Sequence, residues 1–209
     1  MKLTSTSFEH NKPISSEFAF CQPDPDTRVT QGGNKNPALS WSDVPDGTKS
    51  LVLICLDPDA PSKADDVNKE GRTIPADLPR VEFYHWILIG LRADAVGIQA
   101  GEFSDGVTAG GKDGPEGPRG TRQGINDYTN FLAGDRKMAG TYYGYDGPCP
   151  PWNDAIPHRY HFTLYALDIE RVAVGADFTG ADVLKAIDGH ILAQARITAT
   201  YTTNPDVGD

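Results

Sequence analysis

The chain has 209 residues, which is enough to bury a full core, and all-β architectures of this length routinely form one domain. Its 22 glycines and 16 prolines favour strands and turns over helix bundles. The formal net charge of −10 argues against nucleic acids and anionic membrane surfaces as partners, because both recruit clusters of Lys and Arg.

The chain is expected to be cytoplasmic and to have no membrane span. No segment approaches the roughly 20 consecutive apolar residues of a spanning helix, and the first residues lack the apolar core of a signal peptide. The cysteines Cys21, Cys55 and Cys149 form no C-x-x-C pair, and their odd number suits a reducing compartment. Cys55 is expected to be a small buried residue within a strand.

The N-terminal third alternates short apolar pieces with Pro, Asn and Gly. The segment 34–41 leads into a hairpin-like turn at Asp46-Gly47. Residues 51–56 then form a continuous apolar run without polar alternation. Such a run predicts a strand that is buried on both faces.

Two carboxylates held between two prolines follow this strand. Pro58 and Pro61 bias the residues before them toward extended backbone, so Asp57 and Asp59 should project on one side of the chain. A common role of Asp beside Pro is to cap local backbone N–H groups, and this role competes with a binding site. Further polar segments are needed to favour the site.

Two long loops come next. Residues 62–80 are polar and contain Pro75 and Pro79, while residues 106–124 contain seven glycines and two prolines and are predicted to be irregular. Loops of this length in a compact domain are usually functional or partly disordered.

Two histidines lie at the heads of further strands. His85 begins an apolar run, and residues 147–160 carry His158 out of a proline-stiffened loop. From Tyr160 onward apolar and polar residues alternate, so Tyr160 and His161 should face opposite sides of a half-buried strand. Together with the two aspartates, these residues make a pocket of Asp, His and Tyr plausible.

The C-terminal region changes its period. Thr179 to Asp182 resembles a capping box, and apolar residues recur at helical spacing up to about Gln194, with Gly189 as a point where the helix could divide in two. Residues 197–201 alternate as a last strand. The elements together predict a mainly antiparallel β-sandwich, with one or two short C-terminal helices, in one domain over residues 1–209.

Three of these segments resemble one protein family. The sequences DPDAP at 57–61, His-Trp at 85–86, and GP-x-PP followed by HRY-x-F-x-LYALD from 147 to 168 are similar to the phosphatidylethanolamine-binding protein family, specifically its bacterial Raf kinase inhibitor-like branch. The resemblance is in the family's order and extends more loosely over nearly the whole chain. It implies the same β-sandwich and, relative to short bacterial members, inserted loops at about 62–80 and 106–124.

The resemblance also implies a ligand pocket where the three segments converge. Cys149 stands where many eukaryotic members have a Gly that contributes a backbone N–H, and Trp152-Asn153 replaces the more usual Lys-Gly. The mouth of the pocket should therefore be narrower and more aromatic. Carried over residue by residue, the ligand-binding positions are Asp57, Asp59, Pro61, His85, Gly147, Pro150, Pro151, His158 and Tyr160.

The chemistry of these residues suits a phosphate-like anion. Such an anion needs imidazolium and backbone N–H donors, and an aspartate that accepts a hydrogen bond from a His ring would orient that ring and favour its protonated form. We predict a non-catalytic binding protein for a small phosphate-type anion or a phospholipid headgroup, without a metal or another cofactor.

Two alternatives stay open. The Asp and His residues could instead bind a divalent metal or act as general acid and base in a hydrolase. However, the chain has no G-x-S-x-G, no H-E-x-x-H and no P-loop. The second alternative is a regulator or inhibitor, because some family members act by binding a kinase or a protease, which would use loops at the pocket rim.

The candidates for such a rim are aromatic. They are Trp152, Tyr142, Tyr143 and Tyr145, although clustered Tyr in a β protein usually packs in the core, and we favour that role. A homodimer is equally compatible with the sequence. The remaining histidines, which are expected to be structural or solvated, are His10, His161 and His190.

Overall fold

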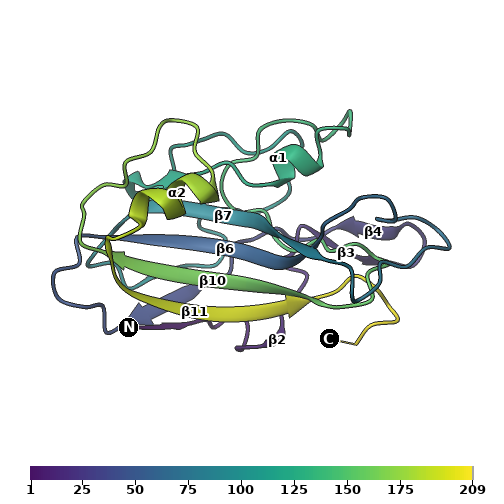
Figure 1. The fold of residues 1–209 in the computed structure, drawn as a ribbon, viewed down its shortest axis with the longest axis horizontal. Coiled ribbons are helices and arrows are strands. Elements are labelled where there is room, and N and C mark those ends of the chain that lie inside the picture. The colour runs from purple at the N-terminus through teal and green to yellow at the C-terminus, as the bar shows by residue number, and fades with distance from the viewer. Residues whose placement is uncertain (209) are drawn as a thin grey trace.

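The computed structural model of the chain describes residues 1–208 and consists mainly of strands (Figure 1). The strands are β1 (Lys2–Thr4), β2 (Lys12–Pro13), β3 (Cys21–Asp24), β4 (Arg28–Gln31), β5 (Leu39–Ser42), β6 (Ser50–Pro61), β7 (Arg80–Arg92), β8 (Gly97–Ile98), β9 (Arg122–Gln123), β10 (His158–Leu167) and β11 (Ile191–Tyr201). The helices are the 3-10 turn η1 (Pro118–Gly120), α1 (Tyr128–Phe131) and α2 (Gly180–Ile187).

A six-stranded sheet forms the centre of the molecule, in the order β2-β11-β10-β6-β7-β9 (Figure 1). A three-stranded sheet β1-β5-β8 and the hairpin β3-β4 complete the strands. Every paired strand is antiparallel to its neighbour except β2, which runs parallel to β11. The predicted mainly antiparallel architecture is confirmed.

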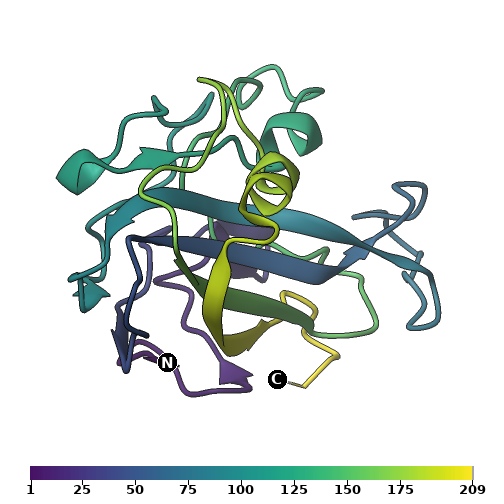
Figure 2. The ribbon, with the colours of Figure 1, turned by 60° about the vertical axis from the view of Figure 1, so that its left-hand side comes forward.

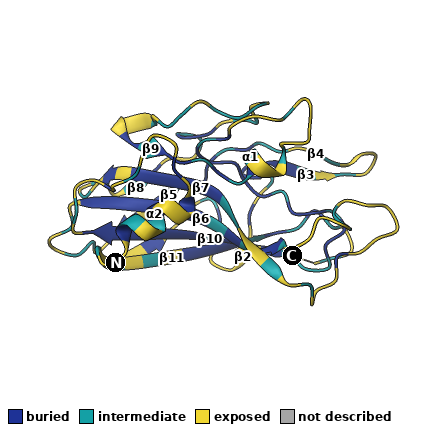
Figure 3. Cartoon of the chain, turned by 45° about the horizontal axis from the view of Figure 1, so that its top comes forward, coloured by how far each residue is buried: buried dark blue, intermediate teal, exposed yellow. Residues whose placement is uncertain are grey.

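Strand β6 is buried on both faces, as its unbroken apolar sequence predicts (Figure 3). Leu51, Leu53 and Cys55 pack into one core, which includes Trp41 of β5. The residues between them pack into a second core, which α2 covers with Val183 and Ile187 (Figure 2). Each face of the central sheet is thus covered by a different layer.

Helix α2 begins as predicted and ends earlier. The Thr179 side chain and the Asp182 side chain bond each other's backbone N–H groups in a capping box. Gly189, with φ of +78°, follows the helix end, and Ile191 already begins β11. The predicted helix up to Gln194 is therefore wrong, because pairing of this segment with β10 overrides its helical spacing.

The turn at Asp46-Gly47 is present but does not join two paired strands. Strand β5 pairs with β1 and β8, whereas β6 pairs with β10 and β7. The turn therefore carries the chain from one sheet to the other, and the predicted hairpin is wrong. The sequence of a turn does not determine which strands its two flanking strands pair with.

The two long loops occupy the predicted positions with one difference. Strand β7 begins at Arg80, directly after the first loop, which contains no helix or strand between 62 and 79. The second loop was predicted to be wholly irregular, but it contains η1 and also β9, which pairs with β7. The prediction is wrong for these two short pieces.

Cys21 and Cys149 form a disulfide, and Cys55 is a buried free thiol. The inference that these cysteines suit a reducing compartment is therefore wrong for this pair. The two cysteines are 128 residues apart, and the fold joins them because Phe20 and Cys21 both donate backbone hydrogen bonds to the Pro148 carbonyl. In the part of the chain that the structure describes, no helix has the length and apolar character needed to cross a membrane.

Candidate functional site

A cavity of about 150 Å³ lies at one end of the central sheet. Its wall comes from β6, β7, β10, α1, the first long loop and the segment 149–151. The lining residues are Asp57, Ala60, Pro61, Lys63, Ala64, Val67, Val81, Phe83, His85, Tyr128, Phe131, Cys149, Pro150, Pro151, His158 and Tyr160.

Most of the predicted site residues line this one cavity, and Asp59 and Gly147 do not. The cavity thus brings together both histidines, one aspartate and the tyrosine from three separate segments. The predicted site residues that line it are Asp57, Pro61, His85, Pro150, Pro151, His158 and Tyr160.

Asp57 and Asp59 do not face the same side, contrary to the prediction. Asp59 turns away from the cavity and binds the Arg159 guanidinium through both oxygens, at 2.8 and 2.7 Å. Burial alone would raise the pKa of Asp59, but the bonds from Arg159 outweigh burial and lower that pKa. The strand is irregular here, because the β6–β7 register shifts between Asp57 and Ala60, and Asp57 accepts the Asp59 N–H at 2.7 Å.

Gly147 contributes to packing rather than to the cavity wall. A Cβ at this position would lie 2.0 Å from the Phe18 carbonyl oxygen. Its N–H donates to the Asn34 side chain, and its carbonyl accepts the Tyr128 hydroxyl. Glycine is required because the backbone of another segment passes too close for a side chain.

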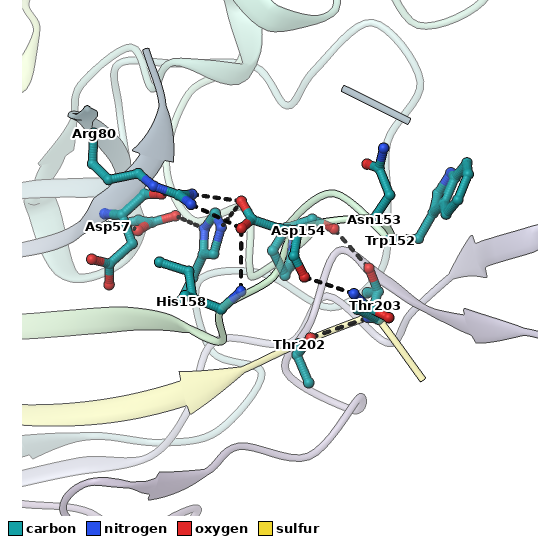
Figure 4. A network of polar contacts seen from close by, with 12 residues as sticks. Asp57, Arg80, Trp152, Asn153, Asp154, His158, Thr202 and Thr203 are labelled. Atoms are coloured by element: carbon teal, nitrogen blue, oxygen red, sulfur yellow. Dashed lines mark hydrogen bonds and ion pairs between the residues drawn. The ribbon is translucent and has the colours of Figure 1, made fainter. Parts of the chain in front are cut away.

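His158 is buried between two carboxylates (Figure 4). Its Nδ1 lies 2.8 Å from Asp57 Oδ2, and its Nε2 lies 3.1 Å from Asp154 Oδ2. Burial would lower the pKa of His158, but the two carboxylates outweigh burial and raise it to about 9. The imidazole is therefore a cation at neutral pH, held by the carboxylate partner that the sequence predicted and by a second one that it did not.

Asp154 was missed by the sequence analysis. Its side chain is 1 % exposed and binds the Arg80 guanidinium at 2.5 and 3.0 Å (Figure 4). Its position four residues before His158 was the available signal. Both ring nitrogens of His158 bond carboxylates, so in this arrangement neither is left to donate to an anion, and its place as a ligand-binding residue stays a prediction.

His85 has one ring nitrogen, Nε2, without a hydrogen-bond partner among the described residues. Its Nδ1 lies 2.7 Å from the Asp146 carbonyl oxygen, which can only accept, so Nδ1 carries a proton and Nε2 has the lone pair in the neutral ring. Burial lowers the pKa of His85, and the nearby carboxylates only partly oppose this shift. The ring is accordingly neutral at pH 7 and surrounded by Phe83, Tyr128 and Tyr160.

Asp146, which holds His85 through its carbonyl, is itself a buried hub. Its carboxylate accepts hydrogen bonds from Asn34 at 2.8 Å, Asn126 at 2.9 Å and the Lys112 ammonium at 2.6 Å. Lys112 belongs to the second long loop. This loop thus reaches the residue behind the cavity floor.

Tyr160 lines the cavity, and its hydroxyl has no hydrogen-bond partner among the described residues. The side chain is 1 % exposed, and its oxygen is a buried polar atom with no hydrogen bond among the described residues. His161 bonds Thr198 and lies outside the cavity, as the alternation predicts. A buried hydroxyl without a partner is costly unless a ligand or water completes it.

The mouth of the cavity is aromatic, but not through the predicted residue. Phe131 is 52 % exposed and lines the mouth beside Val81 and Lys63. Trp152 lies outside the lining, with the Arg28 guanidinium 5.0 Å from its ring centre. The buried side chains of Tyr142 and Tyr145 belong to the core, as favoured from the sequence.

The first long loop covers one side of the cavity and is held by Asn153. The Asn153 amide donates to the carbonyls of Asp66 and Arg72, and its oxygen accepts the Asn68 N–H at 3.0 Å. The loop contributes three residues to the lining, which are Lys63, Ala64 and Val67.

Over residues 1–208, no group of three His, Cys, Asp or Glu side chains has the arrangement of a metal site.

Comparisons with known proteins point to one family. The family model described as phosphatidylethanolamine-binding protein matches residues 4–202. The UPF0098 protein YbhB of Escherichia coli is 35% identical over 171 residues, covering 82% of this chain and 84% of YbhB. A UPF0098 protein of Methanothermobacter thermautotrophicus is 35% identical over 178 residues, covering 85% of this chain and 89% of its own.

Two solved structures have the same fold. The crystal structure of Escherichia coli YbcL, described as a new member of the mammalian PEBP family, has a TM-score of 0.69 at 27% identity and covers 96% of this chain and 97% of that one. The Chlamydia trachomatis homologue CT736 has a TM-score of 0.63 at 30% identity and covers 96% of this chain and 95% of its own.

Proposed function

Because this chain belongs to the phosphatidylethanolamine-binding protein family, we propose that it is a non-catalytic binding protein whose cavity takes a small phosphate-type anion, either free or as a phospholipid headgroup. The observation that carries this proposal is that two cavity-lining rings 5.1 Å apart, those of Tyr160 and His85, each have a polar atom without a hydrogen-bond partner among the described residues.

Tyr160 and His85 could together donate hydrogen bonds to a bound anion. The Tyr160 O–H is a donor, and His85 Nε2 becomes a second donor once the ring is protonated. An anion beside this nitrogen favours the imidazolium, which opposes the effect of burial on the His85 pKa. His158 contributes its positive charge from behind Asp57 rather than a direct hydrogen bond.

The lining residues favour binding over catalysis. The lining contains no Ser or Thr that could act as a nucleophile, and no Lys that is bonded to a carboxylate. Cys149 lines the cavity but is held in a disulfide. His158 resembles half of an acid–base pair, but carboxylates engage both of its ring nitrogens. The doubly bonded His158 ring offers a metal no lone pair, and the described residues contain no group of three His, Cys, Asp or Glu side chains that could hold one.

A protein partner at the same rim is a further proposal from the sequence. The support for it is the exposed apolar surface of Phe131 and Val81, which are 52 % and 47 % exposed beside the mouth. A partner that covered these side chains would also control access to the cavity.

Calorimetric titration with inorganic phosphate and with phosphorylethanolamine tests the anion proposal. Affinity should fall as pH rises from 5.5 to 8, because His85 loses the proton that the anion requires, and a chelator should have no effect. The His85→Ala variant should lose binding, whereas His161→Ala, which removes a histidine outside the cavity, should not. Binding that strengthens with pH, or that disappears with the chelator, would contradict the proposal.

A further inference from the structure

Two buried ion pairs connect the long loops to the residues behind the cavity floor. Arg80, at the end of the first loop, binds Asp154, and Lys112, in the second loop, binds Asp146. The basic side chains are only 11 % and 18 % exposed. In the other Lys and Arg ion pairs of the described residues, the basic side chain is 37 % exposed or more.

The first pair acts on His158. Arg80 contacts both oxygens of Asp154, and one of these oxygens, Oδ2, also receives Nε2 of His158. Arg80 further donates to the Asp59 and Pro75 carbonyls, so its guanidinium is fixed in place. A forked cation that holds both oxygens also fixes the rotation of the carboxylate that orients the imidazole.

The second pair acts on His85. The Lys112 ammonium and two amides hold the Asp146 carboxylate, and the main-chain carbonyl of the same residue accepts Nδ1–H of His85. This carbonyl selects the tautomer in which Nδ1 carries the proton and Nε2 keeps its lone pair. Displacement of Asp146 would release that selection.

Structural stabilisation alone gives a weak reason for these pairs. A buried ion pair must offset the desolvation of both charges, and an apolar pair of similar volume is often equally stable. The Arg80–Asp154 and Lys112–Asp146 pairs differ from the exposed ion pairs of the same loops in what else the acidic residue contacts. In both cases this is a histidine of the cavity.

We propose that Arg80 and Lys112 are positioning residues, through which the two long loops fix the imidazoles of His158 and His85 for the ligand. This inference rests on the proposed function for its purpose, but the orientation of the rings is measurable without any ligand.

The test uses the ligand-free full chain labelled with 15N-histidine. The chain has five histidines, so each ring can be assigned, and 15N chemical shifts report which nitrogen carries the proton. In the wild type we expect His85 as a single Nδ1–H tautomer and His158 with two slowly exchanging N–H protons. Arg80→Lys retains the charge but loses the fork, and should lose the slow exchange at the His158 Nε2–H.

For Lys112, the single variant Lys112→Met leaves a buried carboxylate uncompensated and could fail to fold. The double variant Lys112→Met with Asp146→Asn removes both charges and retains the main-chain carbonyl. It should fold and show His85 as a mixture of tautomers. Matched controls are Arg72→Met and Arg119→Met, which remove exposed ion pairs of the same two loops and should leave all ring signals unchanged.

Unchanged His158 and His85 ring signals in Arg80→Lys and in the double variant would overturn the inference. Ring signals that change as expected, in a protein that does not bind phosphorylethanolamine, would instead reject the proposed function and leave the positioning role standing. If both hold, phosphorylethanolamine affinity should fall by roughly 3- to 10-fold in each variant, the effect of one misdirected hydrogen bond.

Discussion

Tyr160 buries a hydroxyl that no other group in residues 1–208 bonds. Replacement by Phe removes this group with almost no change in shape, so the free energy of unfolding should stay constant or rise by about 1 kcal/mol. Phosphorylethanolamine affinity should fall by about 10-fold, because the ligand loses a donor. Urea unfolding and calorimetry measure the two effects, and a loss of stability above about 1 kcal/mol would show that the hydroxyl has a structural partner.

His158 makes stability depend on pH. Its pKa is about 9 in the folded protein and ordinarily 6.5, so the stabilisation is complete below pH 6.5, declines as pH rises, and is lost above about 9. The expected decline in the free energy of unfolding is about 3 kcal/mol. The lowered pKa values of His85 and His161 place their titration below this window.

Urea unfolding between pH 7 and 9.5 measures this decline for the wild type and for His158→Gln. The variant should have a nearly flat profile, while His161→Gln should retain the wild-type slope. An equal slope in His158→Gln would assign the pH dependence to another group.

At the residue scale, the sequence predicted that one of the two aspartates orients a histidine ring, and the structure identifies the pair as Asp57 and His158. It did not predict the direction of Asp59, because a one-residue irregularity in a strand reverses the side on which a side chain lies. Asp154 escaped notice because its importance depends on Arg80, which is distant in sequence.

At the scale of elements, the Asn153 side chain links the first long loop to the segment that follows Pro151 through hydrogen bonds. The Asn153→Ala variant should leave the Arg72 carbonyl without a donor and the Asp66 carbonyl with only the Lys69 N–H. We expect faster hydrogen exchange across residues 66–74, at a local cost of roughly 2 kcal/mol, with unchanged protection in β6 and β10.

Hydrogen-exchange mass spectrometry measures this effect region by region. Asn130→Ala, which alters an exposed Asn on α1, is the matched control and should change only its own helix. Uniformly faster exchange over all strands in Asn153→Ala would mean that the residue stabilises the whole fold rather than the loop.

The strands were predictable where their patterns extended over many residues. Strand β6 is recognisable from its unbroken apolar run and β10 from its alternation, although β10 is buried on both faces from Phe162 onward and the predicted half-buried strand is wrong there. Where two patterns competed, pairing decided, as in Ile191 to Gln194, whose helical spacing yields to the β10 partner. Short strands such as β9 carry no pattern of their own and exist because a neighbouring edge pairs with them.

At the scale of the whole molecule, the net charge of −10 opposes approach to anionic lipid surfaces. The full chain should therefore not co-sediment with vesicles of phosphatidylglycerol at low salt, whereas the proposed function predicts that it binds phosphorylethanolamine in solution. Vesicles of phosphatidylcholine, which carry no net charge, are the matched comparison. Stronger binding to the anionic vesicles would mean that a local basic surface outweighs the total charge.

The overall architecture was within reach of the sequence, because alternation, turn residues and the family's segment order all indicate the same mainly antiparallel fold. The partnership of Cys21 with Cys149 was not, since it depends on how the sheets are arranged in space rather than on any spacing along the chain.

The Cys21–Cys149 disulfide makes the redox state of the cysteines a marker of the compartment in which the protein folded. Native protein that matured with the link intact should show no reaction with a maleimide, because its single thiol, Cys55, is buried. Protein extracted from its own cells under acid quench, then unfolded and alkylated, would gain one label if it came from oxidising surroundings and three if it came from reducing ones. A mass measurement on one intact chain therefore reads the compartment directly, without fractionating the cell.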